Sequence, residues 1–185
     1  MNKNLYEDSI ILIGPSGAGK STVADDLEER FGIPRVCLDK MASEARKNGE
    51  RAKFKTPDEF SYHMIHSLII AAEKREGAYA VVDFGAGHSI YKDKTIFEKV
   101  KKELKPFKNV VLLLPCKDES KALEIMASRS TGDTSDNLEF LRNPCNKELA
   151  TMVVYAEGRT PQEISDEIMS RIDQRKKKKI NDVEI

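Results

Sequence analysis

The chain has 185 residues, of which 34% are charged, and its 31 Lys and Arg residues balance 31 Asp and Glu residues. A zero net charge gives no overall attraction to nucleic acid or to a membrane surface, so any recognition of phosphate must be local. The length suits one domain with a substantial core.

The cysteine usage and the apolar runs favour a cytoplasmic protein. The three cysteines are widely spaced and form no Cys-x-x-Cys pair, so neither a disulfide framework nor a zinc site is indicated, which fits a reducing cytosol. Residues 1–8 lack the apolar core of a signal peptide, and no apolar run approaches the ~18 residues that a membrane span needs. We therefore expect no membrane partner.

The most informative stretch is a glycine-rich segment between an expected strand at residues 9–13 and an expected helix that begins near Lys20 and ends at Phe31. It fits G-x-x-x-x-G-K-[ST], the P-loop, in which successive backbone N–H groups form a nest for phosphate. The start of the helix adds positive potential at the same place. The following residues are expected to bind ATP: Gly14, Pro15, Ser16, Gly17, Ala18, Gly19, Lys20, Ser21 and Thr22.

Two side chains of this loop have distinct expected roles. Lys20 is placed to reach the β- and γ-phosphates and is a candidate catalytic residue, while the Ser21 hydroxyl is placed to bind Mg²⁺. Asp83 directly follows an apolar strand expected at residues 78–82, where an acid of the Walker-B type would hold Mg²⁺ or its water. We therefore expect ATP and Mg²⁺ as cofactors, with Ser21 and Asp83 as the metal ligands.

An acceptor site is expected beside the P-loop. Asp39 follows a short strand expected at residues 33–38, and in open α/β sheets the ligand crevice lies at the carboxyl ends of the strands. Asp39 is thus a candidate catalytic residue that orients an acceptor hydroxyl and takes its proton. A cap for the next helix is the alternative, compatible role. Gly85, Ala86 and Gly87 allow a ligand to approach the backbone closely, and an ordinary tight turn is the alternative.

A helix is expected to start at residues 56–59, with Thr56 as the N-cap, Pro57 as the first helical residue and Glu59 at the third helical position.

The second half continues the alternation of strands and helices. Strands are expected at residues 109–114 and 151–155, and helices at 96–104, 118–128, 137–149 and from Thr160 onward. The small, polar residues around 129–137 predict a lid, in which Arg129 would balance charge on the transferring phosphoryl group. A solvated charge at a helix end is the alternative for Arg129.

The order of elements predicts the architecture of an α/β protein with three layers. A five-stranded parallel sheet with helices on both faces follows from the alternation, in one domain over residues 1–175. Residues 176–185 begin with four lysines and are expected to form a flexible, solvated tail. A nucleic-acid partner is not favoured, because no aromatic residues or other basic runs accompany these lysines.

Several segments in order along the chain resemble the shikimate kinases. They are the P-loop, Asp39 at a strand end, the Gly85-Ala86-Gly87 triplet, and residues 141–150 and 155–163. The resemblance implies the P-loop NTPase fold of the nucleoside-monophosphate-kinase group, with strand order 2-3-1-4-5. It also implies that ATP lies in the P-loop and that the glycine triplet lines the acceptor site.

The resemblance further assigns roles to three side chains. It implies that Asp39 meets the acceptor hydroxyl, that Arg142 pairs with an acceptor carboxylate and that a lid arginine such as Arg129 closes over the phosphates. We therefore expect these residues to bind the substrate: Asp39, Gly85, Ala86, Gly87 and Arg142.

The chain departs from the shikimate-kinase pattern at positions that, by the resemblance, recognise the acceptor. Cys37 stands where the family has the first acid of Asp-x-Asp, Phe54 is followed by Lys55 rather than arginine, and Ala86 replaces the middle glycine. The lid also lacks the usual Arg-Pro start. We infer an acceptor other than shikimate, and we expect Asp83 to supply the carboxylate that position 37 has lost.

The sequence thus predicts an ATP-dependent phosphotransferase that acts on a hydroxyl or phosphate of a small anionic metabolite. The expected partners are ATP and this acceptor, and the protein is expected to be a monomer or a homodimer. Two alternatives remain: a nucleotide or nucleoside kinase, and a non-catalytic protein that binds ATP but has lost its acceptor pocket.

Overall fold

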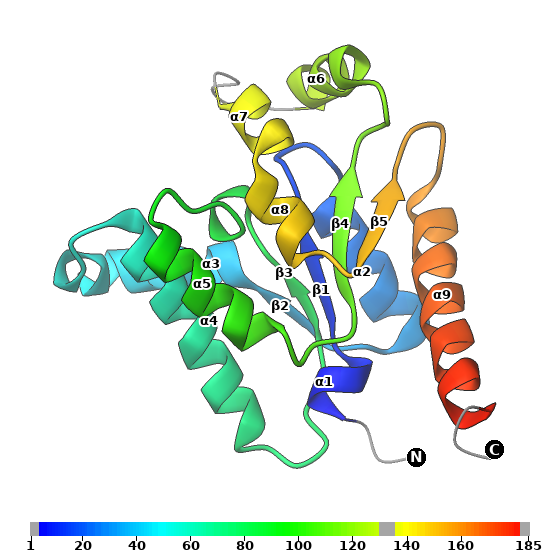
Figure 1. The fold of residues 1–185 in the computed structure, drawn as a ribbon, viewed down its shortest axis with the longest axis horizontal. Helices are drawn as coiled ribbons and strands as arrows, with labels where there is room; N and C mark the ends of the chain where they lie inside the picture. Colours follow the sequence, from blue (N-terminus) through cyan, green and yellow to red (C-terminus); the bar gives the residue numbers. More distant parts are fainter. Residues whose placement is uncertain (1–3, 130–135, 182–185) are drawn as a thin grey trace.

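The structure is a computed structural model that describes residues 4–129 and 136–181. Its centre is a five-stranded sheet with the order β2-β3-β1-β4-β5, in which every pair of neighbours is parallel (Figure 1). This confirms the expected fold and strand order. The strands are β1 (Ile10–Ile13), β2 (Arg35–Cys37), β3 (Val81–Asp83), β4 (Val110–Leu114) and β5 (Met152–Tyr155).

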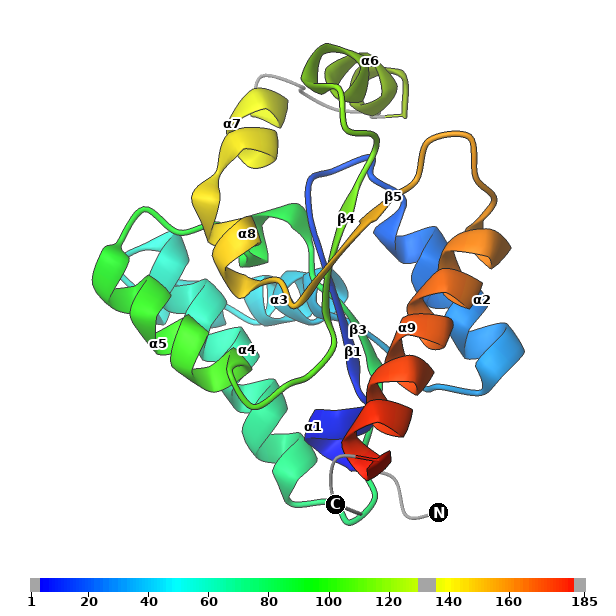
Figure 2. The same cartoon turned by 45° about the vertical axis from the view of Figure 1, so that its right-hand side comes forward.

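Helices cover both faces of the sheet, as expected for an α/β protein with three layers (Figures 1 and 2). One face carries α2 (Lys20–Phe31) and α9 (Pro161–Asn181). The other face carries α3 (Leu38–Lys47), α4 (Pro57–Glu73), α5 (Lys94–Leu104) and α8 (Pro144–Leu149). The remaining elements are α1 (Leu5–Asp8), the 3₁₀ turns η1 (Glu50–Lys53) and η2 (Ala86–His88), α6 (Glu119–Arg129) and α7 (Asn137–Arg142).

The central strand shows why the two layers of helices form. All four residues of β1 are buried, and their side chains alternate between the two faces. Ile10 and Leu12 belong to the core beneath α2 and α9, whereas Ile11 and Ile13 belong to the core beneath α4 and α5. Because each such side chain gains about 1.5–3 kcal/mol on full burial, a strand that is apolar on both sides requires a cover on both sides.

The carboxyl end of β1 is where the site forms. The connection after β1 runs to β2 at one edge of the sheet, and the connection after its neighbour β4 runs to β5 at the other edge, so a crevice opens between them. The P-loop continues directly from β1 with Gly14 at φ +133°, a conformation that L side chains rarely adopt. A Cβ at this position would also overlap the carbonyl oxygen of Leu113, so a glycine is required on both grounds.

The predicted start of α4 is confirmed. Thr56 is the N-cap, Pro57 is the first helical residue, and Glu59 completes a reciprocal capping box. The single helix expected over residues 137–149 is wrong. Asn143 is extended and Pro144 has no N–H to continue the ladder, so the chain forms α7 and α8 instead, with the Asn143 side chain capping α8.

The carboxyl-terminal helix is longer than expected. α9 continues to Asn181, through the lysines that were expected to form a flexible tail. Lys176 and Lys179 pair with Asp8 and Glu7 of α1, at 2.5 and 3.1 Å. Residues 182–185 of that segment, and residues 130–135 of the expected lid, lie outside the described residues. None of the helices in the described part of the chain combines the length and apolar character needed to cross a membrane.

Candidate active site

A cavity of about 420 Å³ lies at the carboxyl ends of the strands, beside the P-loop. It brings together residues from the P-loop, the start of α3, the end of β3, η2 and the end of α6. Its walls are mainly polar, unlike the core around it. The lining residues are Ser16, Gly17, Gly19, Lys20, Ser21, Thr22, Asp39, Asp83, Gly85, Ala86 and Arg129.

Lys20 is held at the centre of the P-loop by its own backbone. Its Nζ donates hydrogen bonds of 2.9 Å to the carbonyl oxygens of Gly14 and Pro15, and the residue is only 7% exposed. Burial lowers the pKa of Lys20 from its ordinary value, while the nearby carboxylates of Asp83 and Asp39 act in the opposite direction. Since an ammonium group has three N–H donors, one of them remains for an anion in the cavity.

Ser21 and Asp83 meet, as their expected role requires. The Ser21 hydroxyl donates a 2.7 Å hydrogen bond to Oδ2 of Asp83, which is 3% exposed. Asp83 also lies directly across from Cys37 in the pairing of β2 with β3, so its carboxylate is next to the position that lacks an acid. The role of the two side chains as metal ligands remains a prediction.

Arg35 is a component of this site that the sequence analysis did not identify. Its Nη2 donates to the same oxygen of Asp83, at 2.9 Å, and its Nη1 pairs with Asp25 of α2. No motif marks it, because it is one residue of a three-residue strand whose neighbours become known only when the sheet is formed. No hydrogen bond from a described residue reaches Oδ1 of Asp83, so this oxygen is available to a ligand.

Asp39 lies in the first turn of α3 and faces the cavity with a side chain that is 62% exposed. The N-cap of α3 is Cys37, so Asp39 does not cap the helix. His88 Nε2 lies 3.4 Å from Asp39 Oδ1. The hydrogen bond from His88 lowers the pKa of Asp39, and the charges of His88, Lys20 and Arg46 act in the same direction, partly opposed by burial.

The glycine triplet contacts Asp39. A Cβ on Gly85 would overlap all three atoms of the Asp39 carboxyl group, so this carboxylate lies directly against the backbone of Gly85. Ala86 also lines the cavity, whereas Gly87 is not among its lining residues, and a Cβ there would meet nothing within 4 Å. The three positions thus differ in how closely they border the cavity.

The two predicted arginines lie in different surroundings. Arg129, the last residue of α6, lines the cavity, and its Nη1 lies 3.4 Å from the carbonyl oxygen of Gly17. Arg142 is not among the lining residues, because Glu119 of α6 holds its guanidinium group with two hydrogen bonds of 3.0 and 2.5 Å. The structure therefore brings Arg129 to the P-loop but not Arg142 to Asp39.

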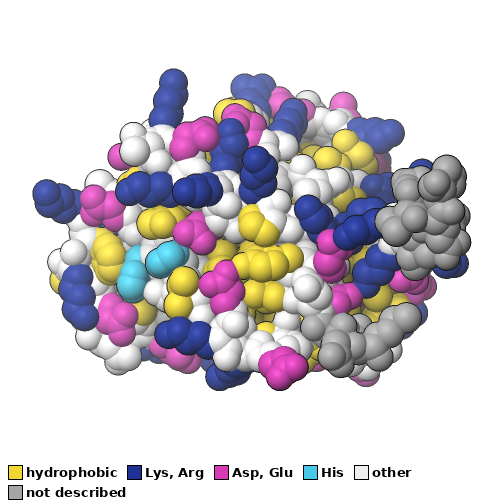
Figure 3. All heavy atoms as spheres, turned by 60° about the horizontal axis from the view of Figure 1, so that its bottom comes forward, with side chains coloured by type: hydrophobic (Ala, Val, Ile, Leu, Met, Phe, Trp, Pro, Cys, Tyr) yellow, Lys and Arg dark blue, Asp and Glu magenta, His cyan; other side chains and the backbone are white. Residues whose placement is uncertain are grey.

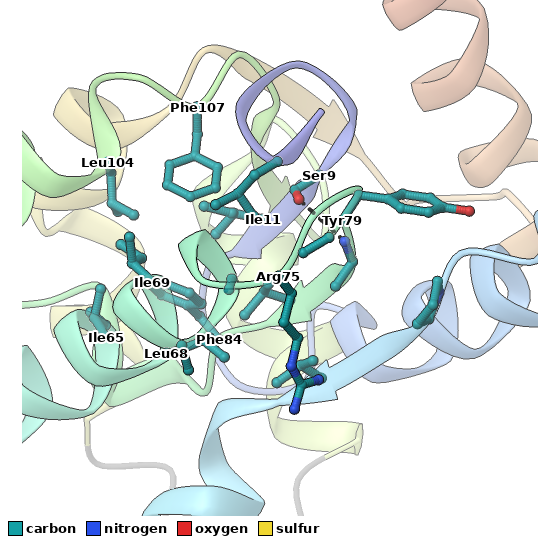
Figure 4. Close-up of a pocket in the computed structure, with 18 of the residues that line it drawn as sticks. Ser9, Ile11, Ile65, Leu68, Ile69, Arg75, Tyr79, Phe84, Leu104 and Phe107 are labelled. Atoms are coloured by element: carbon teal, nitrogen blue, oxygen red, sulfur yellow. Dashed lines mark hydrogen bonds between the residues drawn. The ribbon is translucent and has the colours of Figure 1, made fainter. Parts of the chain in front are cut away.

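A larger cavity, of about 540 Å³, lies at the opposite end of the sheet. Hydrophobic side chains gather in the middle of this face of the molecule (Figure 3), and the close-up shows Ile11, Ile69, Phe84 and Phe107 around the hollow (Figure 4). The hydroxyl of Ser9 accepts a hydrogen bond from the backbone at Ala80 rather than pointing to a ligand. Its walls are mainly apolar, and its charged lining residues are Arg75 and Glu76, whereas the P-loop cavity is lined mainly by polar groups, so we assign the candidate chemistry to the P-loop cavity.

Comparison with known proteins agrees with this geometry. Residues 10–89, which include the P-loop, Asp39 and Asp83, match the family described as AAA domain. The adenylate kinase of Leptospira biflexa serovar Patoc (strain Patoc 1 / Ames) is 28% identical over 145 residues, which are 72% of this chain and 76% of that protein. The adenylate kinase of Sorangium cellulosum (strain So ce56) is 46% identical over 44 residues, and this match spans only 20% of the relative's length and 24% of this chain.

Solved structures of kinases share the fold over nearly the whole chain. The shikimate kinase of Acinetobacter baumannii, in complex with shikimate, superimposes with a TM-score of 0.64 at 20% identity, covering 94% of this chain and 96% of that one. A gluconokinase from Sinorhizobium meliloti 1021 gives a TM-score of 0.58 at 21% identity, covering 92% and 94%. At these identities the similarity establishes the fold alone. The chain therefore has the fold of these kinases, and its glycine-rich loop lies within the residues that match the AAA domain family.

Proposed function

We propose that this protein is an ATP-dependent phosphotransferase that moves the γ-phosphoryl group of ATP to a hydroxyl or phosphate of a small anionic metabolite other than shikimate. The observation that carries the proposal is the convergence of Lys20, the Ser21–Asp83 pair, Asp39 and Arg129 on one cavity. We further propose that it acts in the cytoplasm, as a monomer or a homodimer.

The P-loop side of the cavity suits the triphosphate of ATP. The backbone amides of the loop and the remaining N–H of Lys20 would bind the β- and γ-phosphates. Arg129, whose guanidinium group lies next to Gly17, would contact the γ-phosphoryl group from the lid side. These cations stabilise charge on the phosphoryl oxygens in the transition state, where positioning and electrostatics supply most of the catalysis.

The oxygen atoms of Ser21 and Asp83 fit Mg²⁺. Both are hard donors, and Oδ1 of Asp83 has no hydrogen bond from a described residue. No group of three or more His, Cys, Asp or Glu side chains that could hold a metal occurs in the described part of the chain. Mg²⁺ in kinases is held by one or two protein groups and the substrate phosphates, and Ser21 and Asp83 would supply the protein groups here. When bound, Mg²⁺ neutralises charge on the β- and γ-phosphate oxygens.

Asp39 provides the acceptor side of the reaction. An acceptor hydroxyl in the cavity would give its proton to Asp39 as its oxygen forms a bond to the γ-phosphorus. The bond from that phosphorus to the β–γ bridging oxygen breaks, and ADP leaves with the electron pair. The lowered pKa keeps Asp39 ionised near neutral pH, and its exposed carboxylate is open to the cavity.

A nucleotide or nucleoside kinase is the second candidate. It is supported by the similarity to adenylate kinase of Leptospira biflexa over 72% of this chain. Arg142 would suit a carboxylate or a phosphate on the acceptor equally well, because a guanidinium group binds both in a bidentate manner. The two candidates therefore differ in their acceptors and not in the ATP site.

Calorimetry with Mg-ATP, followed by an acceptor panel, tests the proposal. We expect Mg-ATP to bind and at least one sugar acid, polyol, nucleoside or nucleoside monophosphate to stimulate ADP release. Lys20→Ala should weaken Mg-ATP binding about 10- to 100-fold, because a hydrogen bond to a charged group contributes about 1.5–3 kcal/mol. Lys102→Ala, at an exposed position of α5, is the matched control.

The outcomes separate the candidates. Binding of Mg-ATP without acceptor-stimulated ADP release across the panel would favour a non-catalytic ATP-binding protein. Stimulation by nucleosides or nucleotides alone would favour the second candidate. No uptake of ATP or GTP in the presence of Mg²⁺, or a Lys20→Ala variant that binds as the parent does, would contradict the proposed function altogether.

A further inference from the structure

A buried row of polar side chains lies behind Asp39. His88, Ser61 and Tyr91 come from η2, from α4 and from the segment that follows η2, and they are 3%, 5% and 6% exposed. The Ser61 hydroxyl lies 2.8 Å from His88 Nδ1 and 3.2 Å from the Tyr91 hydroxyl. Tyr91 in turn donates a 2.8 Å hydrogen bond to the carbonyl oxygen of His88. Asp39 lies next to His88 at one end of this row, and it faces the cavity.

The positions of the hydrogens follow from this arrangement. Burial raises the pKa of Tyr91, so its hydroxyl keeps its proton and donates it to the His88 carbonyl oxygen. An ionised Asp39 can only accept, so a hydrogen bond at the 3.4 Å contact requires a hydrogen on Nε2 of His88. Nδ1 of a neutral His88 then accepts from the Ser61 hydroxyl, and Nδ1 of a charged His88 donates to it. In both protonation states Nε2–H points to Asp39.

The backbone of Gly85 also contacts the carboxylate of Asp39. The Asp39 carboxyl group lies against Gly85, where a Cβ would overlap it. Gly85 and His88 belong to one turn, since the His88 N–H donates a 3.0 Å hydrogen bond to the Gly85 carbonyl oxygen. One rigid turn therefore provides both the surface beneath Asp39 and the donor beside it.

We propose that His88 is the positioning residue of Asp39: anchored by Ser61, it donates from Nε2 to Oδ1 and leaves Oδ2 of Asp39 to receive the proton of the acceptor hydroxyl. The reaction part of this inference rests on the proposed function, whereas the contact itself does not. The Gly85–His88 turn thereby fixes the geometry of the base, in addition to bordering the acceptor cavity.

The other groups that face Asp39 do not replace His88. Lys20 of α2 and Arg46 of α3 add positive charge near the carboxylate, but neither forms an ion pair with it in the described part of the chain. Lys20 is directed to the carbonyl oxygens of Gly14 and Pro15. Without His88, Asp39 would keep a favourable electrostatic environment but lose its directional contact.

A spectroscopic experiment tests the contact at neutral pH, independently of any acceptor. In protein labelled with ¹⁵N-histidine, we expect a strongly downfield Nε2–H resonance of His88, assigned through His88→Gln. Asp39→Ala should remove this shift, whereas Asp166→Ala, at an exposed residue of α9 that pairs with Arg30, should keep it. A parent protein with hydrogen on Nδ1 only, or a resonance that Asp39→Ala leaves in place, would overturn the inference.

Kinetics with an acceptor identified by the panel test the consequence. His88→Leu should lower kcat about 100-fold, since small displacements of a catalytic group have effects of this size, with an unchanged KM for ATP. His88→Gln retains an N–H near the Nε2 position and should recover most of the loss. Ser61→Ala acts on the anchor alone and should give a smaller loss, which keeps the test available if His88→Leu does not fold.

The two proposals fail in different ways. If Mg-ATP does not bind or no acceptor is used, the proposed function fails while the Nε2–H resonance still decides the contact. If the parent transfers phosphoryl groups and His88→Leu has the same kcat, the positioning role of His88 is wrong although the protein is a kinase.

Discussion

The hydroxyl of Ser21 donates a 2.7 Å hydrogen bond to Oδ2 of Asp83, although the two residues are 62 positions apart in the chain. Ser21 is the second residue of α2, the helix after the P-loop, and Asp83 is the last residue of the neighbouring strand β3. Asp83 is buried beside the cavity whereas Ser21 is exposed, and Arg35 donates to the same carboxylate oxygen of Asp83. Oδ1 of Asp83 accepts no hydrogen bond from a described residue and would be the atom that binds Mg²⁺.

Asp83→Asn should weaken the dependence on Mg²⁺ far more than the binding of ATP itself. The substitution keeps the volume but removes the negative charge, and we expect the apparent affinity for Mg²⁺ to fall about 10- to 100-fold. Magnesium titrations of turnover and metal-free ATP binding measure the two effects separately. Equal losses in both would count against Asp83 as a metal ligand, and Asp166→Asn is the exposed control.

Gly85→Ala should displace Asp39 without disturbing the local backbone. Gly85 has φ −62°, which alanine adopts readily, but its Cβ would overlap the Asp39 carboxyl group. We expect acceptor-dependent kcat to fall about 100-fold while Mg-ATP binding stays unchanged. The comparison is Gly87→Ala, whose Cβ meets nothing within 4 Å, and in which the His88 Nε2–H resonance should match that of the parent. An undisturbed resonance in Gly85→Ala would contradict the close contact.

The pH dependence of turnover should show no contribution from Asp39 above its ordinary pKa of about 4. The hydrogen bond from His88 lowers the pKa of Asp39, so its carboxylate remains a base as the pH falls through 6 and 5. Because the pKa of Asp39 is lower in the folded than in the unfolded protein, its ionised carboxylate stabilises the fold at pH values above the unfolded-state pKa. This stabilisation is lost as the pH falls through the folded-state pKa. In His88→Leu the acid limb of kcat should move to higher pH, and an unmoved limb in an active variant would argue against Asp39 as the base.

Glu119→Gln should release Arg142 for an anionic acceptor. The side chains of Arg142 and Glu119 are 61% and 45% exposed, so loss of the pair should leave stability nearly unchanged. If Arg142 reads the acceptor, KM for the acceptor should fall in Glu119→Gln and rise in Arg142→Ala. An identical KM in both variants and the parent would show that Arg142 has only a surface role.

Much of the fold could be predicted because it depends on short-range patterns. Apolar strands followed by a glycine turn or by amphipathic helices predicted the parallel sheet, and Thr56-Pro57 with Glu59 predicted the start of α4, all of which the structure confirms. One helix was expected over residues 137–149, so the break between α7 and α8 was missed although Pro144 is a local signal for it. The P-loop itself is contiguous, so its nest could be recognised from residue types alone.

The partners of the candidate catalytic side chains could not be predicted in the same way. His88 contacts Asp39 and Ser61, which lie 49 and 27 positions before it in the chain. Arg35 of β2 contacts Asp83 of the neighbouring strand β3. Whether Arg142 faces the cavity or Glu119 likewise depends on how α6 and α7 pack. A residue's type and its immediate neighbours state what it can donate, accept or bury, whereas its partner is chosen by the packing of distant elements. The phosphate loop was therefore visible along the chain, and the donor that orients Asp39 became visible only once the sheet and its helices were in place.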